Sequence, residues 1–305
     1  MDLTNEWNGI TEEIRLLKIS PRSIPALANL PKNSKFKFRK ISIYSFLIVI
    51  LAFLIFHGSS YVKDVIELNE TCFIQVPESI SLAFRPAMDC NLCKNVRKVH
   101  RVSKISVEKF EKYYAYSQQP VIITDAMKNW SASAAFNFEY FKKLFGNEEV
   151  HSGDMCQFFP YKTHFKSLGE AMNMSSSYMK NTKWYIGWSN CDPFATTELR
   201  NHYSKPYFLP RFSESSRTDW IFMGSPGYGA SMHIDRVGKP SWQAQVKGQK
   251  LWTLEPAPEC YLSCKNRIQV TVNPGEIIVL DTNYWFHSTR IIGSSNSITI
   301  GSEYD

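Results

Sequence analysis

The sequence lacks internal repeats and low-complexity runs, and beyond its first 40 residues it lacks a clear excess of either charge. Residues 1–40 carry eight Lys and Arg against four Asp and Glu, whereas the remainder carries 27 against 24. This balance leaves no electrostatic footprint for DNA or RNA, so we expect no nucleic-acid partner. Hydrophobic residues make up 44% and aromatic residues 14% of the 305 positions, which argues against a wholly disordered chain.

Charge is also absent from the 22 residues between Lys40 and Lys63, ISIYSFLIVILAFLIFHGSSYV. A helix of about 20 apolar residues crosses the hydrocarbon core of a bilayer, so residues 41–62 predict a transmembrane signal-anchor helix. The alternatives are a core helix that is apolar on every side and a cleaved signal peptide. About 40 residues precede the run and no A-x-A-like site follows it, which disfavours the signal peptide.

The flanks of this run predict its orientation. Five Lys and Arg lie in the stretch KNSKFKFRK that ends at Lys40, directly before the span. The positive-inside rule places residues 1–40, a basic tail, in the cytosol and everything after about residue 62 in the lumen or outside the cell. We therefore expect a single-pass type II membrane protein of the endoplasmic reticulum or later secretory pathway.

Three N-x-S/T sequons, at Asn69, Asn129 and Asn173, all follow the predicted span. Each sequon alone is a weak signal. Their joint placement agrees with a luminal domain, and it predicts N-glycosylation at these asparagines.

All seven cysteines also follow the span, as an oxidising compartment permits. Cys90-x2-Cys93 and Cys260-x3-Cys264 suit either disulfides or a four-thiolate zinc site. In an oxidising lumen we favour disulfides, whose pairing the sequence does not assign. An odd count implies a free thiol or an intermolecular bridge.

The rest of the chain divides into a luminal stem, residues 63–99, and a compact domain, residues 100–305. Helical periodicity in residues 105–117 and 136–146 surrounds a strand-like run at 120–126. From Lys183 onward, short runs rich in β-branched and aromatic residues are separated by Gly, Pro, Asn or Asp. The expected strands are KWYIGWS (183–189), DWIFMGS (219–225), SMHID (231–235), WQAQVKGQKLWTLEP (242–256), IQVTVNPGEIIVLD (268–281), YWFHSTRII (284–292) and SITIGSEY (297–304). This spacing predicts a mainly-β fold with flanking helices, a double-stranded β-helix of the cupin or jelly-roll kind.

One of these strands carries a possible half of a metal site. Residues i and i+2 of a strand point to the same side, so His233 and Asp235 can reach one point. His287 lies 54 residues later on a separate expected strand. Two imidazoles and one carboxylate with the remaining positions open suit Fe(II) and leave room for a co-substrate and oxygen.

Several further motifs follow one another in a recognisable order along the chain. HID is followed by QVKGQKLWTLEPAPE, then NPGE, then YWFH, and QQPVIITDAMKNW and FNFEYFKKLFG precede them. Over about residues 100–305 the chain resembles the JmjC-type, cupin-like 2-oxoglutarate oxygenases, especially the small hydroxylase branch that includes factor inhibiting HIF. The resemblance implies a dioxygenase that oxidatively decarboxylates 2-oxoglutarate and hydroxylates a substrate, with Fe(II) and 2-oxoglutarate as cofactors. A luminal or secreted protein is the expected substrate.

The same resemblance assigns site residues. His233, Asp235 and His287 would bind Fe(II), and Lys250 would pair with the distal carboxylate of 2-oxoglutarate. A buried lysine needs a fixed counter-charge, which a dianion supplies. Lys247 is the rival, and a lysine whose stem lies along the surface is the alternative for either.

Three further positions concern the co-substrate. Tyr185 could place a hydroxyl on the same carboxylate. Ala230 stands where the family often has Thr or Ser, so Ser231 or another hydroxyl would have to substitute. Gly301 stands where some relatives have asparagine. Ala230 and Gly301 keep a second hypothesis open, a catalytically silent cupin-like binding or scaffold module. A cupin with another metal is a third, which Lys250 disfavours. Trp188 and Trp252 are expected in the core.

Overall fold

A computed structural model describes residues 85–146, 157–214, 216 and 218–305, of which Pro86–Asp305 form one compact unit. The basic tail, the predicted transmembrane helix 41–62, most of the predicted stem and Asn69 lie outside the described residues. Within the part that is described, no helix is both long and apolar enough to cross a membrane.

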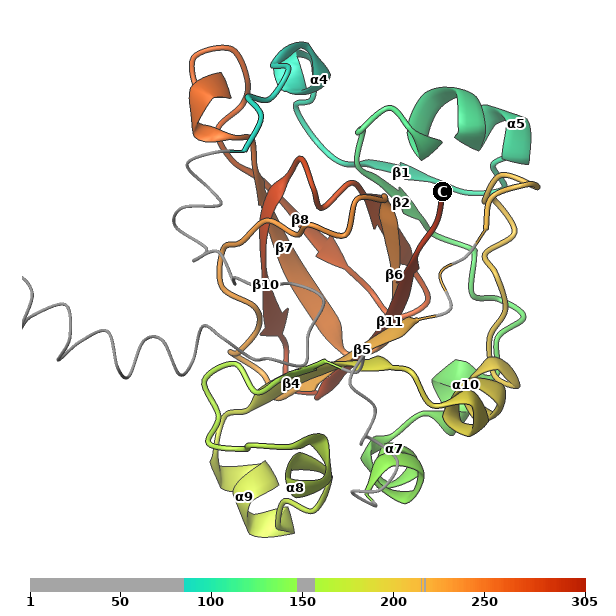
Figure 1. The fold of residues 1–305 in the computed structure, drawn as a ribbon, viewed down its shortest axis with the longest axis vertical. Helices are drawn as coiled ribbons and strands as arrows, with labels where there is room; N and C mark the ends of the chain where they lie inside the picture. The colour runs from blue at the N-terminus through green and yellow to red at the C-terminus, as the bar shows by residue number, and fades with distance from the viewer. Residues whose placement is uncertain (1–84, 147–156, 215, 217) are drawn as a thin grey trace, which may run out of the picture. The chain divides into compact units, whose positions relative to one another are not determined.

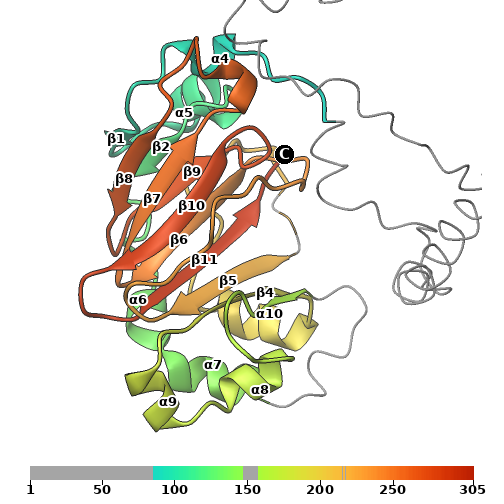
Figure 2. The same ribbon diagram turned by 90° about the vertical axis from the view of Figure 1, so that its left-hand side faces the viewer.

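Two β-sheets enclose the interior of this unit (Figures 1 and 2). The larger has eight strands in the order β1 (His100–Val102), β2 (Val121–Ile123), β9 (Ile277–Leu280), β6 (Ser241–Lys247), β11 (Ser297–Glu303), β5 (Asp219–Gly224), β4 (Tyr185–Asn190) and β3 (Phe158–Phe159). The smaller has the order β10 (Phe286–Ile292), β7 (Gln249–Glu255) and β8 (Ile268–Val272). The strands pair antiparallel except β1 with β2.

The chain crosses from one sheet to the other at glycine turns. The expected run 242–256 is split at Gly248 into β6 and β7, and the run 268–281 at Gly275 into β8 and β9. Both glycines have positive φ, +66° and +90°, a conformation that costs glycine little. Repeated crossing between two facing sheets makes a double-stranded β-helix, so the predicted fold class of this unit is confirmed.

Helices cover the outer face of the larger sheet, and α7 to α10 gather beside β4 in Figure 1. Their bounds are α5 (Val107–Phe110) with a π-turn (Glu111–Ala115), α6 (Ala132–Ala135), α7 (Phe138–Phe145), α8 (Leu168–Met172), α9 (Ser176–Asn181) and α10 (Pro193–Arg200). The side chain of Asn137 caps the start of α7, which ends at Gly146 as the sequence predicts. Phe141 and Phe145 of α7 pack edge-on against Trp188, at ring-centroid distances of 5.7 and 5.5 Å. The predicted helices 105–117 and 136–146 are therefore confirmed.

The N-terminal boundary of the compact unit differs from the expected one. Residues 86–99, assigned to the stem from the sequence, include α4 (Asn91–Lys94) and bury Met88, Val96 and Val99 in the core between the two sheets. The sequence shows no composition change at this point, because the segment is short and its apolar residues are scattered. The domain therefore begins near Pro86.

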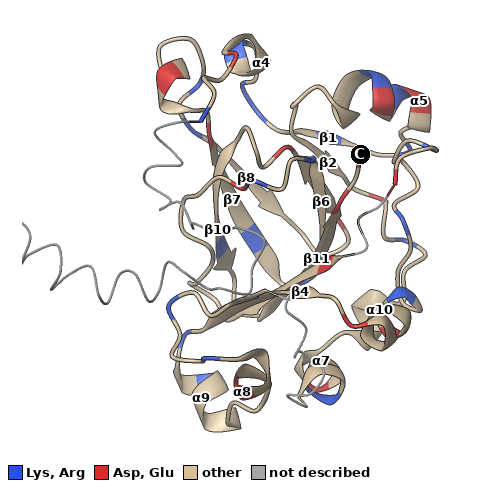
Figure 3. Cartoon of the chain, in the orientation of Figure 1, with Lys and Arg blue, Asp and Glu red and all other residues tan. Residues whose placement is uncertain are grey.

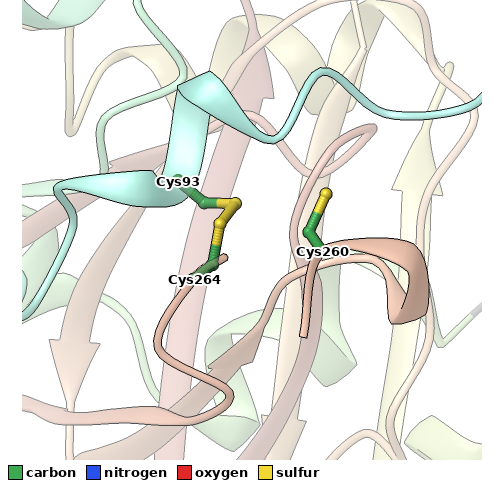
Figure 4. A group of neighbouring side chains, drawn as sticks. All are labelled: Cys93, Cys260 and Cys264. Atoms are coloured by element: carbon green, nitrogen blue, oxygen red, sulfur yellow. A yellow bond between two sulfur atoms is a disulfide. The ribbon is translucent and has the colours of Figure 1, made fainter. Parts of the chain in front are cut away.

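Two disulfides fasten this segment to the chain between β7 and β8. Cys90 bonds to Cys260 and Cys93 to Cys264, and Figure 4 shows the second bond between α4 and the loop. The Sγ atoms of Cys93, Cys260 and Cys264 lie within 4.8 Å of one another, but all three take part in these disulfides. Among the alternatives for the four cysteines, the structure thus contains the disulfides. Cys191 is disulfide-bonded as well.

Candidate metal and co-substrate site

The first two predicted ligands lie on an irregular strand beside β10. Thr289 donates its backbone N–H to the carbonyl of Ala230 at 3.0 Å. His233 and His287 each donate a backbone N–H to the other's carbonyl, at 3.0 and 2.8 Å. Only this last pair forms a ladder bridge, so the expected strand 231–235 is not a regular one. The pairing nevertheless sets both histidines on one rung, although 54 residues separate them.

Three ligand side chains converge at this rung. Nε2 of His233 lies 3.4 Å from Oδ1 of Asp235, and Nε2 of His287 lies 3.8 Å from Oδ2. The ligand atoms of all three residues lie within 4.8 Å of one another. Two donor atoms that share one ion stand roughly 3 Å apart, so a small contraction of this group accommodates a metal. The donor set fits Fe(II), for which two histidines and one carboxylate are the usual ligands.

Backbone carbonyls orient both imidazole rings. Nδ1 of His233 is 2.7 Å from the carbonyl of Ser231, and Nδ1 of His287 is 3.0 Å from the carbonyl of Trp285. A carbonyl only accepts, so each Nδ1 carries the proton and donates it. This tautomer leaves the lone pair of each ring on Nε2, the atom that faces Asp235.

The protonation states also suit metal binding. Burial, with a smaller effect from the nearby His233 ring, lowers the pKa of His287 to about 4, so its imidazole is neutral. Burial acts to lower the pKa of His233, but hydrogen bonding and attraction to Asp235 outweigh it and raise that pKa. Burial acts to raise the pKa of Asp235, but the two histidines outweigh it and lower that pKa, which favours the carboxylate. A divalent cation binds the neutral form of His233, so its binding would release any proton that Nε2 carries.

The site is closed on one side and open on the other. The His287 side chain is 4% exposed, whereas those of His233 and Asp235 are 36% and 34% exposed. Trp252, expected in the core and fully buried, stacks on the His287 ring at a centroid distance of 5.8 Å. Access from solvent is therefore on the His233 and Asp235 side.

Lys250 lies in the interior and bridges the two sheets. Its Nζ donates to the hydroxyl of Tyr185 on β4 at 3.1 Å and to Oγ1 of Thr299 on β11 at 2.7 Å. The residue is fully buried, and burial lowers its pKa to about 7. Among the described residues no carboxylate forms an ion pair with it. Such a lysine fits an anionic ligand, which would provide the missing counter-charge. The rival Lys247 is only half-buried.

Two hydroxyls at this point were not predicted from the sequence. Thr299 contacts Lys250 directly, and Oγ1 of Thr289 accepts from the backbone N–H of Ala230 at 3.1 Å. The sequence contains a signal for Thr289, because it lies two residues after His287 and therefore on the same side of the strand. Ser231, the substitute that the sequence suggested, has an exposed side chain, and its role there is its carbonyl. The hydroxyl next to Ala230 is Thr289 instead.

The neighbouring strand leaves no room for a side chain at Gly301. A Cβ at this position would lie 2.5 Å from the carbonyl oxygen of Trp242 and 2.8 Å from Cγ of Gln243. Gln243 sits directly opposite on β6, and its stem occupies the space above the glycine. A larger side chain at position 301 would therefore collide with the neighbouring strand.

The remaining predicted residues lie away from this site. Trp188 is fully buried under the helices, as expected. Asn129 is exposed in a turn. The amide nitrogen of Asn173 donates to the carbonyls of Gly146 and Gly169, at 3.1 and 2.9 Å.

The chain belongs to the cupin-like domain family, which matches residues 107–267. It is 26% identical over 166 residues to the bifunctional arginine demethylase and lysyl-hydroxylase psr-1 of Caenorhabditis elegans, across 50% of this chain and 40% of that protein. It is 25% identical over 158 residues to the arginine-specific demethylase JMJ22 of Arabidopsis thaliana, across 52% of this chain and 31% of that protein. The chain thus spans less than half the length of these curated relatives. His287 lies beyond the family match, and its place in the site rests on the structure.

Proposed function

We propose that the protein is an Fe(II)- and 2-oxoglutarate-dependent dioxygenase of the JmjC-type, cupin-like group, in its small hydroxylase branch, and that it hydroxylates a protein side chain. His233, Asp235 and His287 would bind Fe(II), and Lys250, with Tyr185 and Thr299, would bind the distal carboxylate of 2-oxoglutarate. The relatives' names combine demethylation and hydroxylation, both of which begin with oxidation of a C–H bond.

The observation that carries the proposal is the convergence of two groups in one interior. Three metal-ligand atoms lie within 4.8 Å of one another, and Lys250 is fully buried with no carboxylate ion-paired to it among the described residues. Lys250 pairs with Ile291 on β10, four residues after His287, so both groups face the same space between the sheets. A metal with a chelating dianion satisfies both groups at once.

When bound, Fe(II) and 2-oxoglutarate supply the oxidation: oxygen and 2-oxoglutarate are consumed, succinate and carbon dioxide leave, and one oxygen atom enters a substrate C–H bond as hydroxyl. The protein's own contribution is orientation. The carbonyls of Ser231 and Trp285 hold the imidazole tautomer, and Trp252 covers the buried side of His287. The open side, at His233 and Asp235, admits the substrate.

Lys250 also takes up a proton when 2-oxoglutarate binds above pH 7. With a pKa of about 7, it is partly neutral in the free protein at physiological pH. An incoming carboxylate favours the ammonium form, so binding above pH 7 takes up a proton at Nζ. Tyr185 and Thr299 already hold the Nζ in place, which lowers the entropy cost of binding.

We place this domain in the lumen of the secretory pathway, anchored to the membrane by residues 41–62. The uncharged run, its basic N-terminal flank and the sequons support this location. The disulfides Cys90–Cys260 and Cys93–Cys264 agree with an oxidising compartment. The substrate would then be a luminal or secreted protein.

The test uses the full chain in detergent, loaded with Fe(II) without oxygen and then exposed to oxygen and 2-oxoglutarate. Succinate is measured without added substrate, beside Asp235→Ala. We expect slow succinate formation that the variant loses. Wild-type protein that holds Fe(II) but neither forms succinate nor binds 2-oxoglutarate would overturn the proposal.

The silent binding module remains the second candidate, and its support came from Ala230 and Gly301. Thr289 supplies a hydroxyl beside Ala230, which favours the enzyme at that position. The succinate measurement separates the two candidates.

A further inference from the structure

A buried carboxylate outside the metal group lies on the open side of the site. Thr299, Gly301 and Glu303 occupy alternate positions of β11, so they share the face on which Thr299 meets Lys250. Glu303 is 8% exposed. The charge of Asp235 contributes to its electrostatics, which places the two carboxylates near each other.

Glu303 has hydrogen bonds but no cation. Its Oε1 accepts from the indole Nε1 of Trp220 at 2.6 Å. Within the described part of the chain no lysine, arginine or histidine forms an ion pair with it. Burial, with a smaller effect from Asp235, raises its pKa. Burying a carboxylate without a counter-ion costs stability, and nothing in the metal or co-substrate group uses it.

Aromatic side chains extend from this carboxylate along the larger sheet. Trp220 stacks on Phe159 at a centroid distance of 6.1 Å, and Phe159 lies 6.3 Å from Tyr161. Trp220 is half-buried and Phe159 is 38% exposed. Such faces pack against the methylene stem of a long side chain and attract its charged head.

We propose that Glu303 receives the cationic head of a substrate side chain of the lysine or arginine class, with Trp220 and Phe159 lining its stem. The indole N–H holds the carboxylate in place, and an ammonium or guanidinium group would add a charge-assisted hydrogen bond to it. The inference rests on the proposed function in one respect, that the bound side chain belongs to the substrate. It gives the substrate a charge, which the metal group alone does not.

Binding of short Gly/Ser/Ala peptides tests this inference. Each peptide has one central Lys, Arg, Gln or Glu, and binding to the full chain is measured by fluorescence anisotropy without oxygen, with Fe(II) and 2-oxoglutarate present. The Lys or Arg peptide is expected to bind roughly tenfold to a hundredfold more tightly than the Gln peptide. The Glu peptide is expected to bind most weakly.

Two variants complete the test. Glu303→Gln keeps an acceptor for the Trp220 indole and should reduce the Lys-to-Gln preference to near one. Glu139→Gln removes the same charge from the exposed side of α7 and should keep it. No preference in the wild type, or a preference unchanged in Glu303→Gln, overturns the inference. A Glu303-dependent preference in a protein that forms no succinate would overturn the proposed function and leave the inference standing.

Discussion

Lys250 and Thr299 connect the two sheets across the interior, through a hydrogen bond of 2.7 Å from Nζ to Oγ1. The lysine is fully buried and lacks an ionic partner among the described residues. The ammonium form of Lys250 is therefore destabilised in the free domain, and an anionic ligand would stabilise it.

Lys250→Met should therefore stabilise the ligand-free protein. Methionine fills similar volume without a charge, and we expect a gain of roughly 1–4 kcal/mol in the free energy of unfolding. The same variant should weaken 2-oxoglutarate binding by about a hundredfold or more. Thermal unfolding and calorimetric titration measure the two effects. The half-buried Lys247→Met is the matched control, and equal behaviour of the two variants would contradict the assignment of Lys250.

The affinity for 2-oxoglutarate should fall as pH rises above neutrality. Burial lowers the pKa of Lys250 from 10.5 to about 7, and the carboxylate binds the protonated form. Above pH 7 the affinity should fall by about tenfold per pH unit until the pKa of the bound form is reached. The stability of the ligand-free protein depends on pH in the opposite direction. The unfolded lysine holds its proton up to about 10.5, so this residue's contribution makes stability rise between those two pH values. Lys250→Met should remove both slopes, and its retention of either would contradict the account.

Gly301→Ala should destabilise the domain by about 1–3 kcal/mol in urea unfolding. The new Cβ would approach the carbonyl oxygen of Trp242 to 2.5 Å, and backbone yields less readily than a flexible side chain. Adding Gln243→Ala removes only the side-chain clash, so it should restore part of the loss at most. Full stability of the single variant would show that the strands separate easily here, contrary to the packing described.

Much of the site could be predicted from sequence because its elements are local. His-x-Asp at i and i+2 leaves a pattern in the letters, and the order of the later motifs, which resembles that of the family, points to the second histidine, His287, and to Lys250. Thr289 leaves only its spacing of two residues from His287, and Glu303 leaves no pattern, since its role comes from contacts between strands far apart in the chain. The sequence predicts that the domain starts at residue 100, later than the start near Pro86 in the structure, for the same reason. Residues 86–99 belong to it through disulfides to Cys260 and Cys264, a pairing that spacing does not reveal.

Removing the bond Cys90–Cys260, by Cys90→Ser with Cys260→Ser, should cost about 2–5 kcal/mol of stability. The bond closes a long loop, because its two cysteines have a sequence separation of 170. Peptide mass spectrometry without reduction checks the pairing in the wild type. Four reduced thiols with one zinc ion per chain would contradict it and favour the zinc alternative.

Expression in a secretory host should add a glycan at Asn129 and none at Asn173. Both asparagines are exposed, but the amide nitrogen of Asn173 is engaged by two carbonyls. Glycosidase treatment of wild type, Asn129→Gln and Asn173→Gln measures this by gel mobility. An unmodified Asn129 would count against a luminal domain.

The most direct test of the central claim is metal-dependent binding of 2-oxoglutarate, measured by calorimetry without oxygen. We expect one molecule to bind per chain when Fe(II) is present, and binding to be lost without metal, in Asp235→Ala and in Lys250→Met. Iron bound by the wild type with no affinity for 2-oxoglutarate, or equal affinity in all three proteins, would contradict the account.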